Sequence, residues 1–229
     1  MTYFSRITLR KDTLEPRRLA HVVTQDTYQD HRGIWRLFPD RPESNRDFLF
    51  RREQWEGSFR YFVLSAQEPS DRDGLWRVET KNFDPKLYQG QVLTFSVRVN
   101  PIITRSSEGN HARHDVIMDA KKAKVYTALP ISERPSQAEL VQTTGLAWLH
   151  SRCGRWGFTP LDGSVLADGY QQQCVYKRGG SSPIRFSTLD FTGILRIDNP
   201  DLFKEALLHG IGPAKGLGCG LLLVKPVSQ

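Results

Sequence analysis

A tyrosine and a histidine lie three residues apart, Tyr28 and His31, in the stretch TYQDHRGIWRLFP. Positions i and i+3 share one face of an α-helix, so both side chains can reach one bound group. A phenol donates hydrogen bonds and an imidazole titrates near neutral pH, which suits proton transfer. The neighbouring Arg32 favours an anionic substrate. Taken singly, the tyrosine is more typical of packing and the histidine of a solvated or core position.

A second distinctive stretch is GIGPAKGLGCG, residues 210–220. Its density of glycines, with Gly212 and Gly218 among them, allows positive φ and close approach of a ligand to backbone N–H groups. Lys215 adds a point charge, so a phosphate backbone is a natural ligand. The GxxxxGK[ST] order of a Walker loop is absent, and no strand directly precedes the stretch as in a dinucleotide-binding turn. A tight turn without a ligand is the alternative.

The overall charge also favours a polyanionic partner. The chain has 229 residues with 32 Lys and Arg against 25 Asp and Glu, a formal net charge of +7. Nucleic acid is the first partner that this balance indicates, an anionic membrane surface the second, and a merely basic protein without such a partner the alternative. No segment approaches the ~20 apolar residues of a membrane span, and the first thirty residues lack a signal-peptide core.

The cysteines indicate a reducing compartment. Cys153, Cys174 and Cys219 are odd in number and show no CxxC spacing, so they suit neither a disulfide framework nor a zinc site. We therefore expect a cytoplasmic protein without a metal or a small-molecule cofactor. His111, His114 and Asp115 could suggest a metal cluster, but we favour a solvated basic loop there, without further ligands nearby in sequence.

Basic residues also flank the turn RGGSSP, which joins two segments with strand character, 169–177 and 184–197. A basic β-ribbon of this kind can lie along an RNA stem and contact phosphates, and a solvated hairpin tip is the alternative. The residues concerned are Lys177, Arg178 and Arg185. A run of three lysines, Lys121, Lys122 and Lys124, is similarly ambiguous.

The elements that must position these residues begin with a strand over 3–9, followed by a helix from residue 27 to Pro39. Thr27 can cap this helix with Asp30 completing a capping box, and its apolar stripe ends in Leu37 and Phe38. Three more strands are expected, with a weaker helix before the last of them. They cover 47–53, 60–66 and 75–81.

The same order of elements follows in the second half. A strand over 92–101 is followed by a polar, irregular stretch over 105–135. Ser136 and Glu139 form a capping box for a helix that ends near Cys153, with Gly154 at its C′ position. The hairpin comes next. Asn199 and Pro200 then begin a last helix, which ends at Gly210 before a strand over 220–226.

These features together resemble the RAMP superfamily of CRISPR-associated proteins and, within it, the CasE family. The resemblance extends from residue 3 to about residue 226. Four blocks carry it: YQDHRGIWRLFPDRPESNRDFLF (28–50), VRVNP (97–101), RHDVIMDAK (113–121) and GIGPAKGLGCGLL (210–222). It implies an α+β fold of two tandem ferredoxin-like (RRM-like, βαββαβ) domains, which we place at residues 1–90 and 91–229.

The resemblance also implies an activity. CasE proteins cut CRISPR precursor RNA at the 3′ base of each repeat hairpin without metal, and their catalytic Tyr and His lie three residues apart in the first helix. Tyr28 and His31 match that pair. The implied partners are the repeat hairpin, the retained crRNA and the other Cascade subunits. We expect RNA contacts from a set of basic residues and glycines: Arg32, Arg98, Lys177, Arg178, Arg185, Gly212, Lys215 and Gly218.

Two functions remain open at the level of sequence. The first is a metal-independent endoribonuclease that uses the 2′-OH of its own substrate as the nucleophile. The second is a non-catalytic RNA-binding RAMP scaffold subunit with the same glycine loop and basic surface. Only the first requires Tyr28 and His31. The sequence does not assign the acid and the base, since the second group can be water, Tyr28 or Lys215.

Overall fold

A computed structural model describes residues 1–10, 27–38, 47–107, 110–176 and 182–227. The first half forms one antiparallel sheet in the order β2-β3-β1-β4, with a helix between its first two strands in the chain. The elements are β1 (Tyr3–Leu9), α2 (Thr27–Trp35), β2 (Phe48–Trp55), β3 (Ser58–Ser65) and β4 (Trp76–Asn82). This strand order is that of a ferredoxin-like domain.

The second half builds a five-stranded sheet in the order β11-β5-β10-β8, and β9 also pairs with β10. Strands β8 and β9 together take the place of one ferredoxin strand. The elements are β5 (Val92–Val99), β6 (Ile102–Ser107), β7 (Asn110–Asp115), α3 (Val116–Lys122), α4 (Lys124–Ala128), η2 (Ile131–Glu133), α5 (Gln137–Cys153), η3 (Gly154–Trp156), β8 (Phe158–Pro160), β9 (Leu166–Val175), β10 (Ile184–Ile197), α6 (Pro200–His209), η4 (Lys215–Leu217) and β11 (Leu222–Pro226).

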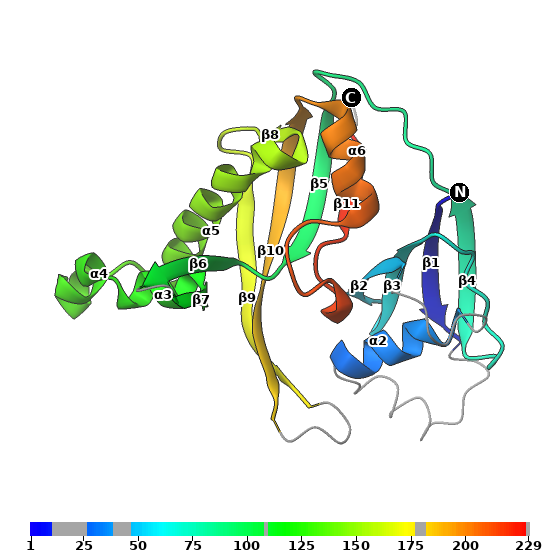
Figure 1. Cartoon of the computed structure of the whole chain (residues 1–229), viewed down its shortest axis with the longest axis horizontal. Coiled ribbons are helices and arrows are strands. Elements are labelled where there is room, and N and C mark those ends of the chain that lie inside the picture. Colours follow the sequence, from blue (N-terminus) through cyan, green and yellow to red (C-terminus); the bar gives the residue numbers. More distant parts are fainter. Residues whose placement is uncertain (11–26, 39–46, 108–109, 177–181, 228–229) are drawn as a thin grey trace.

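Each sheet has its own core, and a third cluster joins the two. Leu49 and Leu64 of the first sheet pack with Leu221, which leads into β11. The Arg51 guanidinium, in β2, donates a hydrogen bond of 2.8 Å to the Ser96 hydroxyl of β5. Figure 1 shows the two sheets side by side, with α2 beside the loop that precedes β11. The predicted boundary between residues 90 and 91 falls in the connection from β4 to β5 and stays a prediction.

The expected helix between β3 and β4 is absent, and residues 66–75 form bends and irregular structure instead. The Asp71 carboxylate accepts hydrogen bonds from the backbone N–H groups of Asp73 (3.1 Å) and Trp76 (2.7 Å). A side chain that bonds to the backbone ahead of it stabilises a turn in place of a helix. The prediction of a second helix in this half was therefore wrong.

The sequence predicted an irregular stretch over 105–135, and this prediction was wrong. It contains the β6–β7 hairpin, the short helices α3 and α4, and η2. The hairpin forms a separate sheet, and Figure 1 shows it projecting with α3 and α4 away from the main body. Strands β6 and β7 lack the alternation of apolar and polar residues that identifies a half-buried strand. The reason is that they do not pack as part of a large sheet.

The helix caps were predicted more accurately. The Ser136 hydroxyl and Glu139 form the expected capping box of α5, and the Asn199 side chain caps α6. Gly154, however, has a right-handed φ of −59° and begins η3, and the left-handed residue is Gly157 with φ of +74°. An added Cβ at Gly157 would lie 2.4 Å from the carbonyl oxygen of Asn199, so the close approach of α6 requires a glycine there.

Candidate active site

Helix α2 carries Tyr28 and His31 and is anchored, with the residues that follow it, in the core of the first sheet. Ile34 is fully buried, and Leu37 and Phe38 are nearly so. Tyr28 and His31 are both half-buried and Arg32 is exposed. The i, i+3 spacing therefore gives the shared, partly accessible face that proton transfer on a bound group requires.

The His31 ring is held among aromatic side chains. Its centroid lies 5.6 Å from that of Trp35, 5.7 Å from that of Phe48 and 6.2 Å from that of Phe50. The planes of His31 and Phe48 are within 27° of each other, a stacked arrangement. Packing of this kind restricts the rotamers of the imidazole and fixes the direction of its nitrogens.

A buried polar cluster around Asp30, which lies between Tyr28 and His31 in the chain, connects α2 to the sheet. The Asp30 side chain is 3 % exposed and accepts hydrogen bonds from Arg52 Nη1, at 3.1 Å to one oxygen and 3.3 Å to the other. The Tyr61 hydroxyl donates to the same carboxylate at 2.5 Å. Burial first, and then the Asp30 charge, raise the pKa of Tyr61 well above its usual value.

This cluster gives Asp30 a long-range role that the sequence did not indicate. The residue before Thr27 lies outside the described ranges, so the predicted capping box of Thr27 and Asp30 stays a prediction. Asp30 bonds across the fold to residues 22 and 31 positions away. Its carboxylate therefore fixes the orientation of the helix that carries Tyr28 and His31.

The glycine-rich loop from α6 to β11 lies against this helix. Its 3₁₀ turn η4 contacts both α2 and β2. Gly218 has φ of +78°, and an added Cβ there would lie 3.3 Å from the Phe50 ring. Phe50 also contacts His31, so one aromatic side chain joins the loop to the helix. Gly212 has φ of +70° with open space around it.

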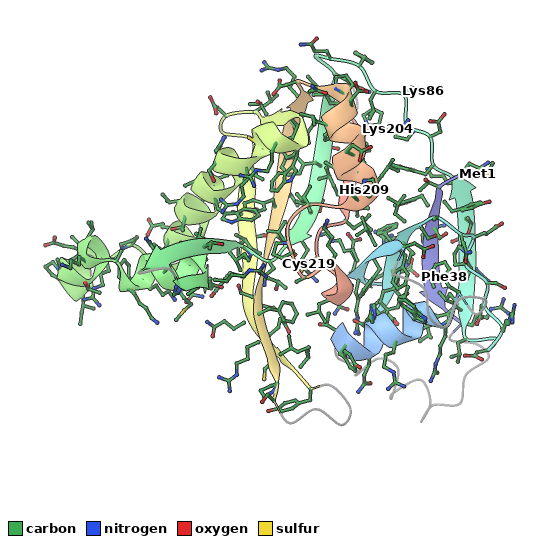
Figure 2. All side chains as sticks on the ribbon, viewed as in Figure 1. Met1, Phe38, Lys86, Lys204, His209 and Cys219 are labelled. Atoms are coloured by element: carbon green, nitrogen blue, oxygen red, sulfur yellow. The ribbon has the colours of Figure 1, made fainter. Side chains whose placement is uncertain are left out.

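Lys215 belongs to the same loop. It is half-buried and lines a hollow of about 410 Å³ together with Asp47, Phe48 and His209. Phe48 is the ring on which His31 stacks. Lys215 and Phe48 therefore line one hollow, which His31 and Tyr28 do not line. Figure 2 shows His209 at the end of α6 and Cys219 within the loop.

A junction cleft of about 230 Å³ lies where the two halves meet; its lining residues are Thr27, Asp30, Phe50, Arg52, Arg98, Gln173, Cys174, Val175, Thr188, Leu217 and Gly218. Tyr28 and His31 do not line it. It places Arg52 and Arg98, from different sheets, beside the start of α2. The Arg52 guanidinium is bonded there to the Asp30 carboxylate, which lines the same cleft.

Arg98 is engaged within the protein. Its guanidinium forms a two-point ion pair with Asp190 of β10, at 2.8 Å and 2.7 Å. The hydrogen bonds to Asp190 raise the pKa of Arg98, so the group stays charged. A phosphate would share this guanidinium with Asp190. The predicted RNA contact of Arg98 stays a prediction.

The remaining basic candidates are spread over the C-terminal half. Arg185 is exposed near the start of β10. Lys177 and Arg178 lie outside the described residues. The three lysines 121, 122 and 124 belong to α3 and α4, on the projecting hairpin arm.

The segment with His111, His114 and Asp115 is strand β7, not a loop, and this corrects the sequence interpretation. The Asp115 carboxylate caps α3 through the Met118 N–H and accepts from the Tyr170 hydroxyl. Within the described residues, no group of three or more His, Cys, Asp or Glu side chains could hold a metal ion. In the same ranges, no helix is long and apolar enough to cross a membrane.

Sequence reasoning missed Arg52 and Tyr61. Phe48, Phe50 and Arg52 alternate along β2 and face α2. An arginine at a core-facing position of a strand signals a buried acidic partner, and this signal could have identified Asp30.

Comparison with known proteins gives a consistent picture. A family model described as "CRISPR associated protein" matches residues 2–226. The chain is 32 % identical over 213 residues to the CRISPR system Cascade subunit CasE of Escherichia coli K12, covering 91 % of this chain and 96 % of that one.

Two further matches involve Thermus thermophilus. The CRISPR-associated endoribonuclease Cse3 of this organism is 26 % identical over 236 residues, which cover 95 % of this chain and 99 % of that protein. A solved structure of Cse3 bound to an RNA representing a pre-cleavage complex aligns with a TM-score of 0.71 at 24 % identity, covering 98 % of this chain and 99 % of that chain. At that identity the structure supports the fold, and the two ferredoxin-like halves are confirmed.

Proposed function

This chain belongs to the CRISPR associated protein family, and from that premise we propose that it is the endoribonuclease that cuts CRISPR repeat RNA and remains in Cascade with its product. Two relatives support the proposal by name, one an endoribonuclease and the other a Cascade subunit. The observation that carries it is local. The helix face with Tyr28 and His31 meets the glycine loop across Phe50.

The reaction needs little beyond alignment, because RNA carries its own nucleophile. The 2′-OH upstream of the scissile phosphate loses its proton and its oxygen attacks phosphorus. The 5′-oxygen leaves and takes up a proton. The products are a 2′,3′-cyclic phosphate and a 5′-OH. Holding the 2′-oxygen in line with the leaving oxygen removes much of the entropic barrier.

His31 carries out proton transfer at this centre. Its ring is fixed by Trp35, Phe48 and Phe50, which gives the imidazole a defined direction. Tyr28 donates a hydrogen bond to a phosphate oxygen or orients the 2′-OH. Lys215 is the cation that the glycine loop brings to the site, and it balances the charge that develops on the phosphate oxygens.

Outside the catalytic pair, the protein surface binds the phosphate backbone of the RNA. Gly212 and Gly218 let the phosphates approach the loop closely. The basic contacts that we propose are Arg32, Arg98, Lys177, Arg178, Arg185 and Lys215. Contacts of this kind fix position and orientation, while the hairpin shape is recognised through its groove dimensions.

We also propose that the protein acts in the cytoplasm. Its three cysteines are all free, and Cys153 and Cys219 are buried. Unpaired cysteines are typical of a reducing compartment. This location is also where a transcript and its processing enzyme meet.

The direct test is single-turnover cleavage of a labelled repeat hairpin in excess EDTA by wild type and His31→Ala. The variant should cut ~10²-fold more slowly or worse with little change in hairpin affinity. His150→Ala is the matched control, since His150 is exposed on α5. Normal cutting by His31→Ala would contradict the assignment. Tight binding without any cutting by wild type would instead favour the scaffold function. Activity that requires added magnesium would contradict metal-independent cleavage.

A further inference from the structure

A second, larger cleft lies on the other side of the glycine loop. We call it the arm cleft, since the β6–β7 arm forms one wall and the β9–β10 ladder another. Pro213, Ala214 and Leu217 of the glycine loop close it. Its volume of about 860 Å³ is in the range of sites that hold one small ligand. Gln173, Cys174 and Leu217 line both this cleft and the junction cleft, so the two adjoin.

Two exposed guanidinium groups border the arm cleft. Arg113 comes from β7 and Arg185 from β10. Neither has a hydrogen bond or an ion pair with any residue that the structure describes. The acidic side chain of this cleft, Asp115, is occupied by the Met118 N–H and the Tyr170 hydroxyl. Both positive charges are therefore available to an anionic ligand, and guanidinium groups match phosphate geometry well.

The cleft also contains a buried hydroxyl that lacks a partner. Ser187 is 4 % exposed and lines the cleft. Its Oγ makes no hydrogen bond within the described part of the chain. Asn100 Nδ2 holds the Ser187 carbonyl oxygen at 2.9 Å, so the residue is fixed in place. A buried polar atom without a partner costs free energy, which a ligand in the cleft would recover.

The remaining lining suits a flat, polar-edged ring. Pro213, Leu217 and the half-buried Phe186 supply apolar surface, and Gln172 and Gln173 supply amides. Amides offer a donor and an acceptor side by side, as the edge of a base requires. Two cations for a phosphate and an apolar, amide-lined wall for a base together describe a nucleotide.

We propose that the arm cleft binds one unpaired nucleotide of the repeat RNA beside the hairpin stem. Arg113 and Arg185 hold its phosphate, and its base lies against the glycine loop with its edge at Ser187. This inference rests on the proposed function, because the adjoining junction cleft begins at α2. One strand would then pass from the catalytic helix into the arm cleft, and the enzyme would read a nucleotide at a fixed distance from the cut.

The test is a scan of single abasic sites through the unpaired nucleotides that flank the hairpin. One position should weaken binding to wild type by ~10-fold, the loss expected for one base contact. Ser187→Ala and Arg113→Gln should each weaken binding of the intact RNA and should lose the extra sensitivity to that abasic site. Arg155→Gln is the matched control, since Arg155 is exposed on η3, and it should keep the wild-type pattern.

A second readout separates binding from folding. Ser187→Ala removes a hydroxyl that makes no bond in the described chain, so its Tm should equal or exceed that of wild type. If Ser187→Ala folds poorly, the test uses Arg113→Gln alone, because Arg113 is exposed and its replacement should not affect folding. The proposal that the arm cleft binds a nucleotide would be overturned if an abasic site weakened binding equally in wild type and both variants, or if no position were sensitive. Either result would leave the proposed cleavage activity intact. Failure of wild type to bind or cut the intact repeat would instead overturn the proposed function.

Discussion

Tyr61→Phe tests the buried cluster that orients α2, the helix that carries Tyr28 and His31. The substitution removes one hydroxyl and keeps a ring that is 1 % exposed and packs against Phe50, Phe59 and Trp76. The lost bond, of 2.5 Å, ends on a carboxylate. Hydrogen bonds to charged groups contribute about 1.5–3 kcal/mol, so we expect a loss of about 2 kcal/mol in the free energy of unfolding. In a chain of 229 residues this lowers Tm by about 4–8 °C.

The effect of pH gives the prediction a second, independent part. The folded pKa of Tyr61 is raised above its unfolded value, near 10. Its contribution to stability is therefore complete below about pH 10 and is lost as the pH rises through the folded pKa. Tyr61→Phe lacks this contribution. The difference in stability between wild type and variant should thus be constant near neutral pH and shrink above about pH 10.

Urea unfolding followed by tryptophan fluorescence at pH 7.5 and pH 10.5 measures both parts. Tyr176→Phe is the matched control, because Tyr176 is 65 % exposed and its loss should change stability by less than about 0.5 kcal/mol. Single-turnover cleavage by Tyr61→Phe should also slow, since α2 is held less firmly. Wild-type stability for Tyr61→Phe at pH 7.5 would refute the role given to the cluster.

Two further predictions concern the RNA surface. The slope of log Kd against log salt should flatten by up to about one unit in Arg185→Ala and remain unchanged in the control Arg155→Ala; an unchanged slope for Arg185→Ala would move the footprint to another face. Iodoacetamide should alkylate Cys174 alone, because Cys153 and Cys219 are buried and burial raises the pKa of both thiols, that of Cys219 to about 12. Bound repeat RNA should protect Cys174 in intact-mass measurements, and modification at an equal rate with RNA present would contradict the placement of RNA along β9.

Local patterns in the sequence predicted most of the fold. Alternating apolar residues identified most strands of the two main sheets, though not the short β8. The caps at Ser136 and Asn199 depend on contacts within three residues along the chain. The errors arose where a side-chain contact or an isolated hairpin outweighs the expected pattern. Asp71 bonds ahead to Trp76 and closes a turn where a helix was expected. The β6–β7 hairpin stands apart from the main sheets and so lacks a core-facing pattern.

In the candidate site, too, local features were predicted from the sequence and long-range contacts were not. The helix that carries Tyr28 and His31 was predicted because their relationship is a spacing along one helix, and their catalytic role stays a prediction. Asp30 was assigned a local cap, which stays a prediction, and its bonds to Arg52 and Tyr61, 22 and 31 residues away, were not foreseen. Arg98 is paired to Asp190, 92 residues further on. Such contacts depend on how the sheets pair and pack, which local periodicity does not encode.

The nucleophile is the central claim, and one substitution in the substrate tests it. A 2′-deoxy nucleotide immediately 5′ of the scissile phosphate should abolish cleavage by the wild-type enzyme. Binding should remain nearly intact, since one hydroxyl contributes on the order of 1 kcal/mol. The normal downstream product should carry a 5′-OH. Cleavage of the deoxy substrate, or a 5′-phosphate on the downstream product, would show that water is the nucleophile and would contradict the roles given to Tyr28 and His31.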